Sequence, residues 1–124
     1  MDIYRENVLD HYKNPRNFGN MDKPDAKFKD SNPLCGDEVE FYLKISGGKI
    51  SDVKYRGQGC AISQASASIL SEKLIGMKIT DAMKLEKEDV TAWLGSELTP
   101  SRLKCALLPV MVAKAAINEF EEKK

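Results

Sequence analysis

Hydrophobic and polar residues alternate with a period of two over residues 39–45, which predicts a β-strand with one buried face. Gly47 and Gly48 follow this segment and are typical of a tight hairpin turn. Residues 50–55 then predict a returning strand, with an irregularity at Ser51 and Asp52, and residues 26–30 predict a short third strand. The first half of the chain therefore predicts an antiparallel meander.

Helical periodicity takes over at both ends of this meander. Residues 1–13 predict a short helix that stops before Pro15. After Cys60, apolar residues recur every three or four positions as far as Leu74, and Gly76 is typical of a helix end. We therefore expect a helix to follow directly on the last strand.

Three more helices are expected in the remainder of the chain. Thr80 is a candidate cap for a short helix, residues 87–94 predict another, and Thr99 is a candidate cap for the last one. Pro109 cannot donate a hydrogen bond to the carbonyl of Cys105, so it predicts a kink or a restart within the last helix.

Strands followed by helices predict an α+β fold, in which a small antiparallel three-stranded sheet from the N-terminal half packs against C-terminal helices. The length of 124 residues suits one domain over the whole chain. We expect its sheet at about residues 26–57 and its later helices at about residues 60–122.

The charge balance excludes some classes of partner. Nineteen Lys and Arg residues stand against nineteen Asp and Glu residues, and the formal net charge is zero. Attraction to nucleic acid is therefore not expected. No stretch is long and apolar enough for a membrane span, and the first residues do not resemble a targeting signal, so we expect a cytoplasmic protein without membrane partners.

The three cysteines are the strongest candidates for chemistry. Cys35, Cys60 and Cys105 lie 25 and 45 residues apart, and none belongs to a Cys-x-x-Cys pair. An odd number of cysteines disfavours a disulfide framework, and the wide spacing disfavours a zinc finger. If the cysteines form one site, tertiary structure must bring them together.

The neighbours of the cysteines favour such a site. Gly36 allows an unusual backbone after Cys35, and Asp37 can project to the same side as that thiol. Cys60 follows Gly59 where strand gives way to helix, so the helix N-terminus should favour its thiolate.

Cys105 lies about one turn into the last predicted helix, beside the cations Arg102 and Lys104, which should again favour the thiolate.

Three thiolates and one carboxylate are four donors, enough for tetrahedral Zn²⁺ or for the terminal positions of a [2Fe–2S] cluster. The carboxylate of Asp37 suits iron less well than a thiolate does, which would make it the weak ligand of a site that releases its cargo. The alternative is that the three cysteines are small buried hydrophobic residues.

The segments around these cysteines, with YRENVLDHYKNPRNFG at the N-terminus, resemble the U-type iron–sulfur cluster scaffold family of IscU, the N-terminal domain of NifU, and SufU. The resemblance implies that Cys35, Asp37, Cys60 and Cys105 hold a transient [2Fe–2S] cluster, with Zn²⁺ or Fe²⁺ possible in its absence. It implies a cysteine desulfurase as sulfur donor and apo-proteins as cluster acceptors. Frataxin-like or ferredoxin partners are also possible by this resemblance. Such a protein is a carrier and not an enzyme.

The chain departs from IscU in two places and from SufU in one. IscU has a histidine at the position of Lys104, whereas SufU-like relatives have a lysine there, as this chain does. Because a protonated lysine cannot bind a metal, Asp37 is the better fourth ligand. We assign Lys104 a role beside the site, steadying an anionic thiolate or persulfide, and Gly36 and Gly59 a role in its backbone. The interval between Cys60 and Cys105 is short for the insertion of the SufU branch. Residues 98–102 lack the usual proline-rich sequence, which argues against recruitment of the dedicated Hsp70.

Two rival hypotheses stay open: a zinc-dependent sulfur acceptor that works with a desulfurase as a sulfurtransferase, and a structural zinc module.

Other candidate residues give weaker evidence for a functional site. His11 is expected to pack or cap and not to bind a metal, and Ser63, Ser66 and Ser68 are expected to form a small-residue packing face. No histidine lies near these serines in sequence, so a hydrolase is not supported.

Overall fold

The computed structural model describes residues 3–32, 36–94 and 99–123. Its three strands, β1 (Ala26–Asn32), β2 (Asp37–Ser46) and β3 (Lys49–Gln58), pair antiparallel in the order β1-β2-β3. The three-stranded antiparallel sheet predicted from the hydrophobic alternation is therefore confirmed, and β1 runs two residues further than predicted.

The hairpin between β2 and β3 is set by two glycines. Gly47 and Gly48 both have positive φ, 59° and 76°, as a two-residue type I′ turn requires. Ile45 pairs with Ile50 and Lys44 pairs with Asp52, so Ser51 is an extra residue in β3. This bulge is the predicted irregularity.

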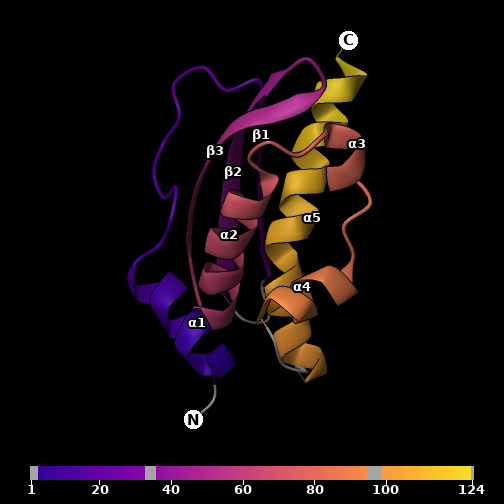
Figure 1. The fold of residues 1–124 in the computed structure, drawn as a ribbon. Coiled ribbons are helices and arrows are strands. Elements are labelled where there is room, and N and C mark those ends of the chain that lie inside the picture. The colour runs from indigo at the N-terminus through magenta and orange to yellow at the C-terminus, as the bar shows by residue number, and fades with distance from the viewer. Residues whose placement is uncertain (1–2, 33–35, 95–98, 124) are drawn as a thin grey trace.

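In the part of the chain that the structure describes, five helices accompany the sheet: α1 (Ile3–Lys13), α2 (Ala61–Leu74), α3 (Ile79–Ala82), α4 (Lys87–Leu94) and α5 (Pro100–Glu122). Figure 1 shows α2 and α5 side by side against one face of the sheet, with α1 beside the start of α2. Both α2 and α5 begin at the same end of the molecule, away from the C-terminus. The predicted α+β architecture is confirmed.

Two details of the helical half differ from the prediction. α3 begins at Ile79, with Lys78 in the capping position, so Thr80 lies inside the helix and does not cap it. Ile79 is buried, and its packing sets the start of this helix in preference to the capping tendency of threonine. α5 is one continuous helix of 23 residues with Pro109 in its interior, so of the predicted kink or restart the restart does not occur.

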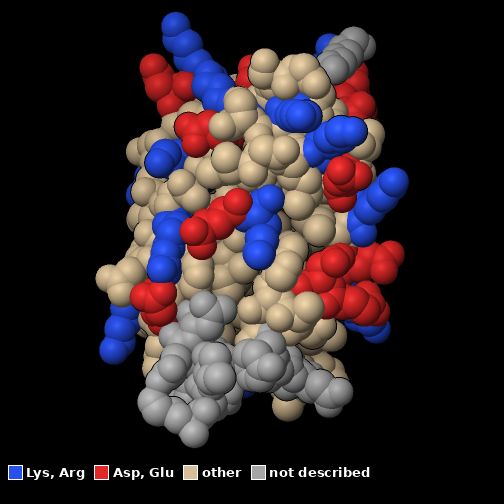
Figure 2. All heavy atoms as spheres, viewed as in Figure 1, with Lys and Arg blue, Asp and Glu red and all other residues tan. Residues whose placement is uncertain are grey.

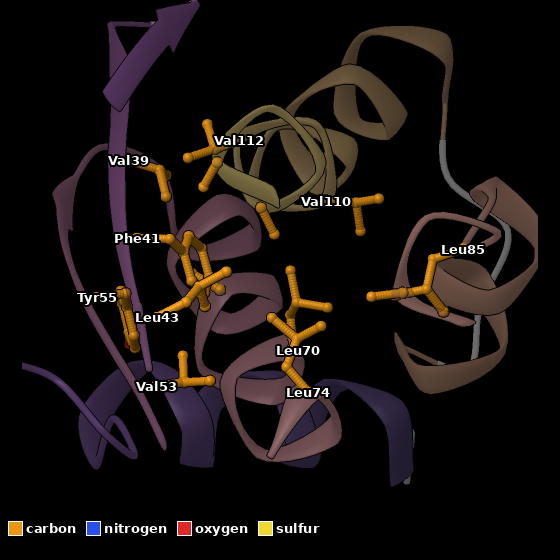
Figure 3. Close-up of a cluster of buried hydrophobic side chains, with 14 of the residues drawn as sticks. Val39, Phe41, Leu43, Val53, Tyr55, Leu70, Leu74, Leu85, Val110 and Val112 are labelled. Atoms are coloured by element: carbon orange, nitrogen blue, oxygen red, sulfur yellow. The ribbon is translucent and has the colours of Figure 1, made fainter. Parts of the chain in front are cut away.

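The hydrophobic core lies between the sheet and the two long helices. Figure 3 shows the inward side chains of β2 and β3 facing those of α2 and α5. All of the labelled residues are buried: Val39, Phe41, Leu43, Val53, Tyr55, Leu70, Leu74, Leu85, Val110 and Val112. Alternate positions of β2 thus supply one wall of the core, as the period of two indicates.

A buried polar cluster holds α1 against α2. His11 is 7% exposed, and its Nδ1 lies 2.7 Å from Oγ of Ser68. The backbone N–H of Arg16 also donates to this hydroxyl, at 2.9 Å, and Nε2 of His11 lies 3.6 Å from a carboxylate oxygen of Glu72. The expectation that His11 packs against the protein is confirmed.

The surface mixes both signs of charge. On the face seen in Figure 2, Lys and Arg side chains stand among Asp and Glu side chains. Lys29 forms an ion pair with Glu38, and Arg16 forms one with Asp10, each at 2.6 Å. Among the described residues, no helix is both long and apolar enough to cross a lipid bilayer.

Candidate metal centre

Three potential metal ligands from distant parts of the sequence meet at the end of the molecule where α2 and α5 begin. Asp37 is the first residue of β2, Cys60 immediately precedes α2, and Cys105 is in the second turn of α5. One ligand atom from each of these residues lies within 4.8 Å of the other two. The fold therefore brings together three of the four residues that the sequence singled out.

Asp37 is the most deeply buried of the three. Its exposed fraction is 0%. Its Oδ1 accepts a hydrogen bond of 2.8 Å from the backbone N–H of Cys60, and its Oδ2 lies 3.8 Å from Sγ of the same residue. One carboxylate oxygen is thus held by the backbone, and the other faces a thiol.

Gly59 makes this close approach possible. Its φ is +137°, and a Cβ atom at this position would lie 2.2 Å from Oδ1 and 2.8 Å from Cα of Asp37. A side chain would therefore collide with both the carboxylate and the backbone of Asp37. Only glycine lets the turn before Cys60 lie directly against the start of β2.

Cys60 caps α2 through its sulfur. Its Sγ accepts the N–H of Ser63 at 3.5 Å, and Oγ of Ser63 donates back to the carbonyl of Cys60 at 3.1 Å. The sulfur therefore lies at the positive end of the helix dipole, as predicted. Cys60 is partly exposed, whereas Cys105 is 4% exposed, so the site opens to solvent on the side of Cys60.

Three predicted site residues remain: Cys35, Gly36 and Lys104. Cys35 lies outside the described residues. Gly36 has a φ of +71°, which supports the expected unusual backbone. Lys104 is exposed and borders a groove of about 360 Å³ that Leu107 and Met111 also line. Its assignment beside the site stays a prediction.

The serines of α2 prove to do more than pack. Ser63, Ser66 and Ser68 are buried, which confirms the expected small-residue face, and Ser71 on the same helix is buried as well. Their hydrogen-bond partners were not predicted, however, notably the carbonyl of Ala106 in α5, to which Ser66 donates. No sequence signal identifies such a partner, because a backbone carbonyl is present at every residue.

The donor set fits a metal centre. Tetrahedral Zn²⁺ with sulfur and oxygen ligands places its ligand atoms about 3.5–3.8 Å apart. The 3.8 Å between Sγ of Cys60 and Oδ2 of Asp37 lies at the upper end of this range. No two of the three ligand atoms are more than 4.8 Å apart, so a side-chain shift of about 1 Å would bring all of them within it. Two thiols and a carboxylate also suit iron bound to sulfide.

Comparisons with known proteins agree with this chemistry. Residues 3–124 match the family described as NifU-like N terminal domain. The chain is 37% identical over 125 residues to the iron-sulfur cluster assembly enzyme IscU of Drosophila melanogaster, covering 98% of this chain and 80% of the relative. It is 36% identical over 124 residues to the zinc-dependent sulfurtransferase SufU of Bacillus subtilis, covering 86% of this chain and 83% of the relative.

A solved structure gives the same picture. The SUF-system protein FiSufU of Fervidobacterium islandicum superposes with a TM-score of 0.76 at 33% identity, over 90% of this chain and 94% of that protein. The resemblance seen in the sequence motifs is therefore confirmed. The relatives carry two kinds of name, one for iron-sulfur cluster assembly and one for a zinc-dependent sulfurtransferase.

Proposed function

The chain belongs to the family of NifU-like N-terminal domains, and on this premise we propose that it is a scaffold for a transient [2Fe–2S] cluster. The cluster is cargo: it is assembled from delivered sulfur and iron and then passed to apo-proteins. The observation that carries the proposal is the fully buried carboxylate of Asp37, which lies beside the thiols of Cys60 and Cys105.

Burial of the carboxylate favours a cation at this place. A buried ionised group is costly unless hydrogen bonds or an opposite charge compensate it. The N–H of Cys60 compensates Oδ1 of Asp37, and a metal ion between the thiolates would compensate Oδ2. With Cys35, two residues before Asp37 in the sequence, the site would have four donors.

The same geometry supports a labile cluster. Because the N–H of Cys60 already holds Oδ1, Asp37 has one oxygen left for a metal and would bind through that oxygen alone. A single carboxylate oxygen is a harder and weaker ligand for iron in a sulfide cluster than a thiolate. An incoming thiolate of an acceptor protein would therefore displace Asp37 first.

The position of the site suits exchange with other proteins. Cys60 is partly exposed where α2 begins, so sulfur can arrive and a cluster can leave without unfolding of the core. We propose a cysteine desulfurase as sulfur donor and apo iron–sulfur proteins as acceptors. Frataxin-like and ferredoxin partners, the absence of a dedicated Hsp70, and a cytoplasmic location stay predictions.

A second function is favoured by one specific observation. The 3.8 Å between Sγ of Cys60 and Oδ2 of Asp37 matches the ligand spacing of tetrahedral zinc, and a relative at 36% identity is named a zinc-dependent sulfurtransferase. In this alternative the thiols accept sulfur from a desulfurase beside a zinc ion, and no cluster forms.

Anaerobic reconstitution with iron and sulfide separates the two functions. The scaffold proposal expects a coloured protein with about two irons and two sulfides per site, and loss of the colour in Cys60→Ser. The zinc alternative expects tight zinc binding that iron does not displace, with no colour. A colourless protein after reconstitution of the zinc-free chain would rule out the scaffold.

A further inference from the structure

A hydrogen bond ties together the two helices that carry the described thiols. Oγ of Ser66, in α2, donates to the carbonyl of Ala106, in α5, at 2.7 Å. Ser66 is 2% exposed and Ala106 is 0% exposed, so water does not compete for this bond. Its short length and burial make it a directional constraint between α2 and α5.

The acceptor lies in the turn of α5 that Pro109 perturbs. In a regular helix the N–H of residue 109 would donate to the carbonyl of Cys105, but proline has no N–H and its ring crowds that turn. The carbonyl of Ala106 is the next one along the chain, and its second lone pair remains available to a side chain. Ser66 thus bonds to α5 next to the turn that contains Pro109.

This bond lies close to both thiols. Ala106 directly follows Cys105 in the chain, and Ser66 is six residues after Cys60, which corresponds to about 9 Å along a helix axis. Apolar packing already holds α2 against α5, and the hydrogen bond adds a directional constraint at one point of their contact. A shift of α5 relative to α2 at Ser66 would therefore also move the sulfur of Cys105 relative to that of Cys60.

We propose that Ser66 is a positioning residue of the metal centre: its hydrogen bond to the turn before Pro109 sets the separation of the Cys60 and Cys105 sulfurs. The effect on the thiols rests on the structure alone. The effect on bound metal rests on the proposed function, because it requires that these thiols are ligands.

The test compares Ser66→Ala with Ser71→Ala, which removes the same hydroxyl from the same helix. Ser71 bonds to the carbonyls of Ser68 and Arg16 and receives the side-chain amide of Asn17, so its hydroxyl does not bond to α5. Both variants are made in a Cys35→Ser background, which leaves two thiols. Their equilibrium with glutathione disulfide, without metal, gives the effective concentration of the Cys60–Cys105 pair.

We expect this effective concentration to fall about tenfold in Ser66→Ala and by no more than about twofold in Ser71→Ala. The dissociation constant for Co²⁺ of the chain with all three cysteines should rise about tenfold in Ser66→Ala only. A fall in effective concentration below about threefold in Ser66→Ala, or an equal fall in both variants, would overturn the inference.

Pro109→Ala keeps the inference testable if Ser66→Ala does not fold. Alanine restores an N–H at residue 109, so this variant favours the fold of α5 and should change the turn whose carbonyl accepts the hydrogen bond from Ser66. We expect it also to change the effective concentration of the thiol pair, and an unchanged value would contradict the proposal. The thiol measurement involves no metal, so failure of cluster reconstitution does not affect it.

Discussion

Replacement of Gly59 by alanine tests how the site is built. A Cβ at this position would lie 2.2 Å from Oδ1, 2.8 Å from Cα and 3.0 Å from Cγ of Asp37. The carboxylate alone could rotate away, but the backbone of Asp37 is held in the sheet and cannot. The variant must therefore separate the turn before Cys60 from the start of β2 and break the hydrogen bond between Cys60 and Asp37.

Two contributions make up the expected loss of stability. A positive φ of 137° at a non-glycine residue costs about 1–3 kcal/mol, and overpacking against backbone costs about another 1–3 kcal/mol. Together they predict that Gly59→Ala lowers the free energy of unfolding by about 2–6 kcal/mol. This is a large part of the stability of a small domain.

Gly76→Ala is the matched control. Gly76 also has a positive φ, +89°, but a Cβ there would have no atom within 4 Å. It should lose only the strain contribution, about 1–2 kcal/mol, and keep its affinity for Co²⁺. Urea denaturation and Co²⁺ titration measure both quantities. If Gly59→Ala loses no more stability than Gly76→Ala, or retains full Co²⁺ affinity, the account of the close approach is wrong.

Two further predictions concern pH and metal removal. Burial lowers the pKa of His11 below 6.5, helped by the charge of Arg16 and opposed by that of Glu72. The unfolded chain therefore binds the proton more readily, so the free energy of unfolding should fall as the pH drops below about 6.5. Urea titrations between about pH 5 and 8 should show a flatter pH dependence in His11→Gln. An unchanged pH dependence in this variant would contradict the prediction. The hydrophobic core cluster contains none of Asp37, Cys60 and Cys105, so a chelator should leave a cooperative thermal transition, whereas loss of that transition would indicate a structural zinc module.

The sheet and its core face could be predicted from the sequence because they depend on local patterns. Val39, Phe41 and Leu43 alternate with polar residues, and this period survives folding unchanged. The turn at Gly47 follows from the conformational freedom of glycine. The same holds for the start of α2, because the change from strand to helical periodicity falls at Cys60.

The parts that could not be predicted depend on contacts between distant residues. The sequence suggests Asp37 as a ligand, but its burial depends on the missing Cβ of Gly59, which only the folded chain brings near. Ser66 could be assigned to a packing face but not to its acceptor, 40 residues away. The start of α3 followed the burial of Ile79 in place of the capping tendency of Thr80. At α3 tertiary packing overrides a local preference, and at Asp37 and Ser66 it adds contacts that no local pattern encodes.

The central claim is that the carboxylate of Asp37 is the weak ligand from which the cargo departs. The most direct measurement is the rate of cluster transfer to an apo-ferredoxin from reconstituted Asp37→Ala, compared with the unmodified chain and with Glu38→Ala, which removes the adjacent carboxylate paired with Lys29. We predict that Asp37→Ala still binds a cluster but transfers it more slowly, while Glu38→Ala transfers it at the unmodified rate. A transfer rate that is unchanged in Asp37→Ala would contradict the account.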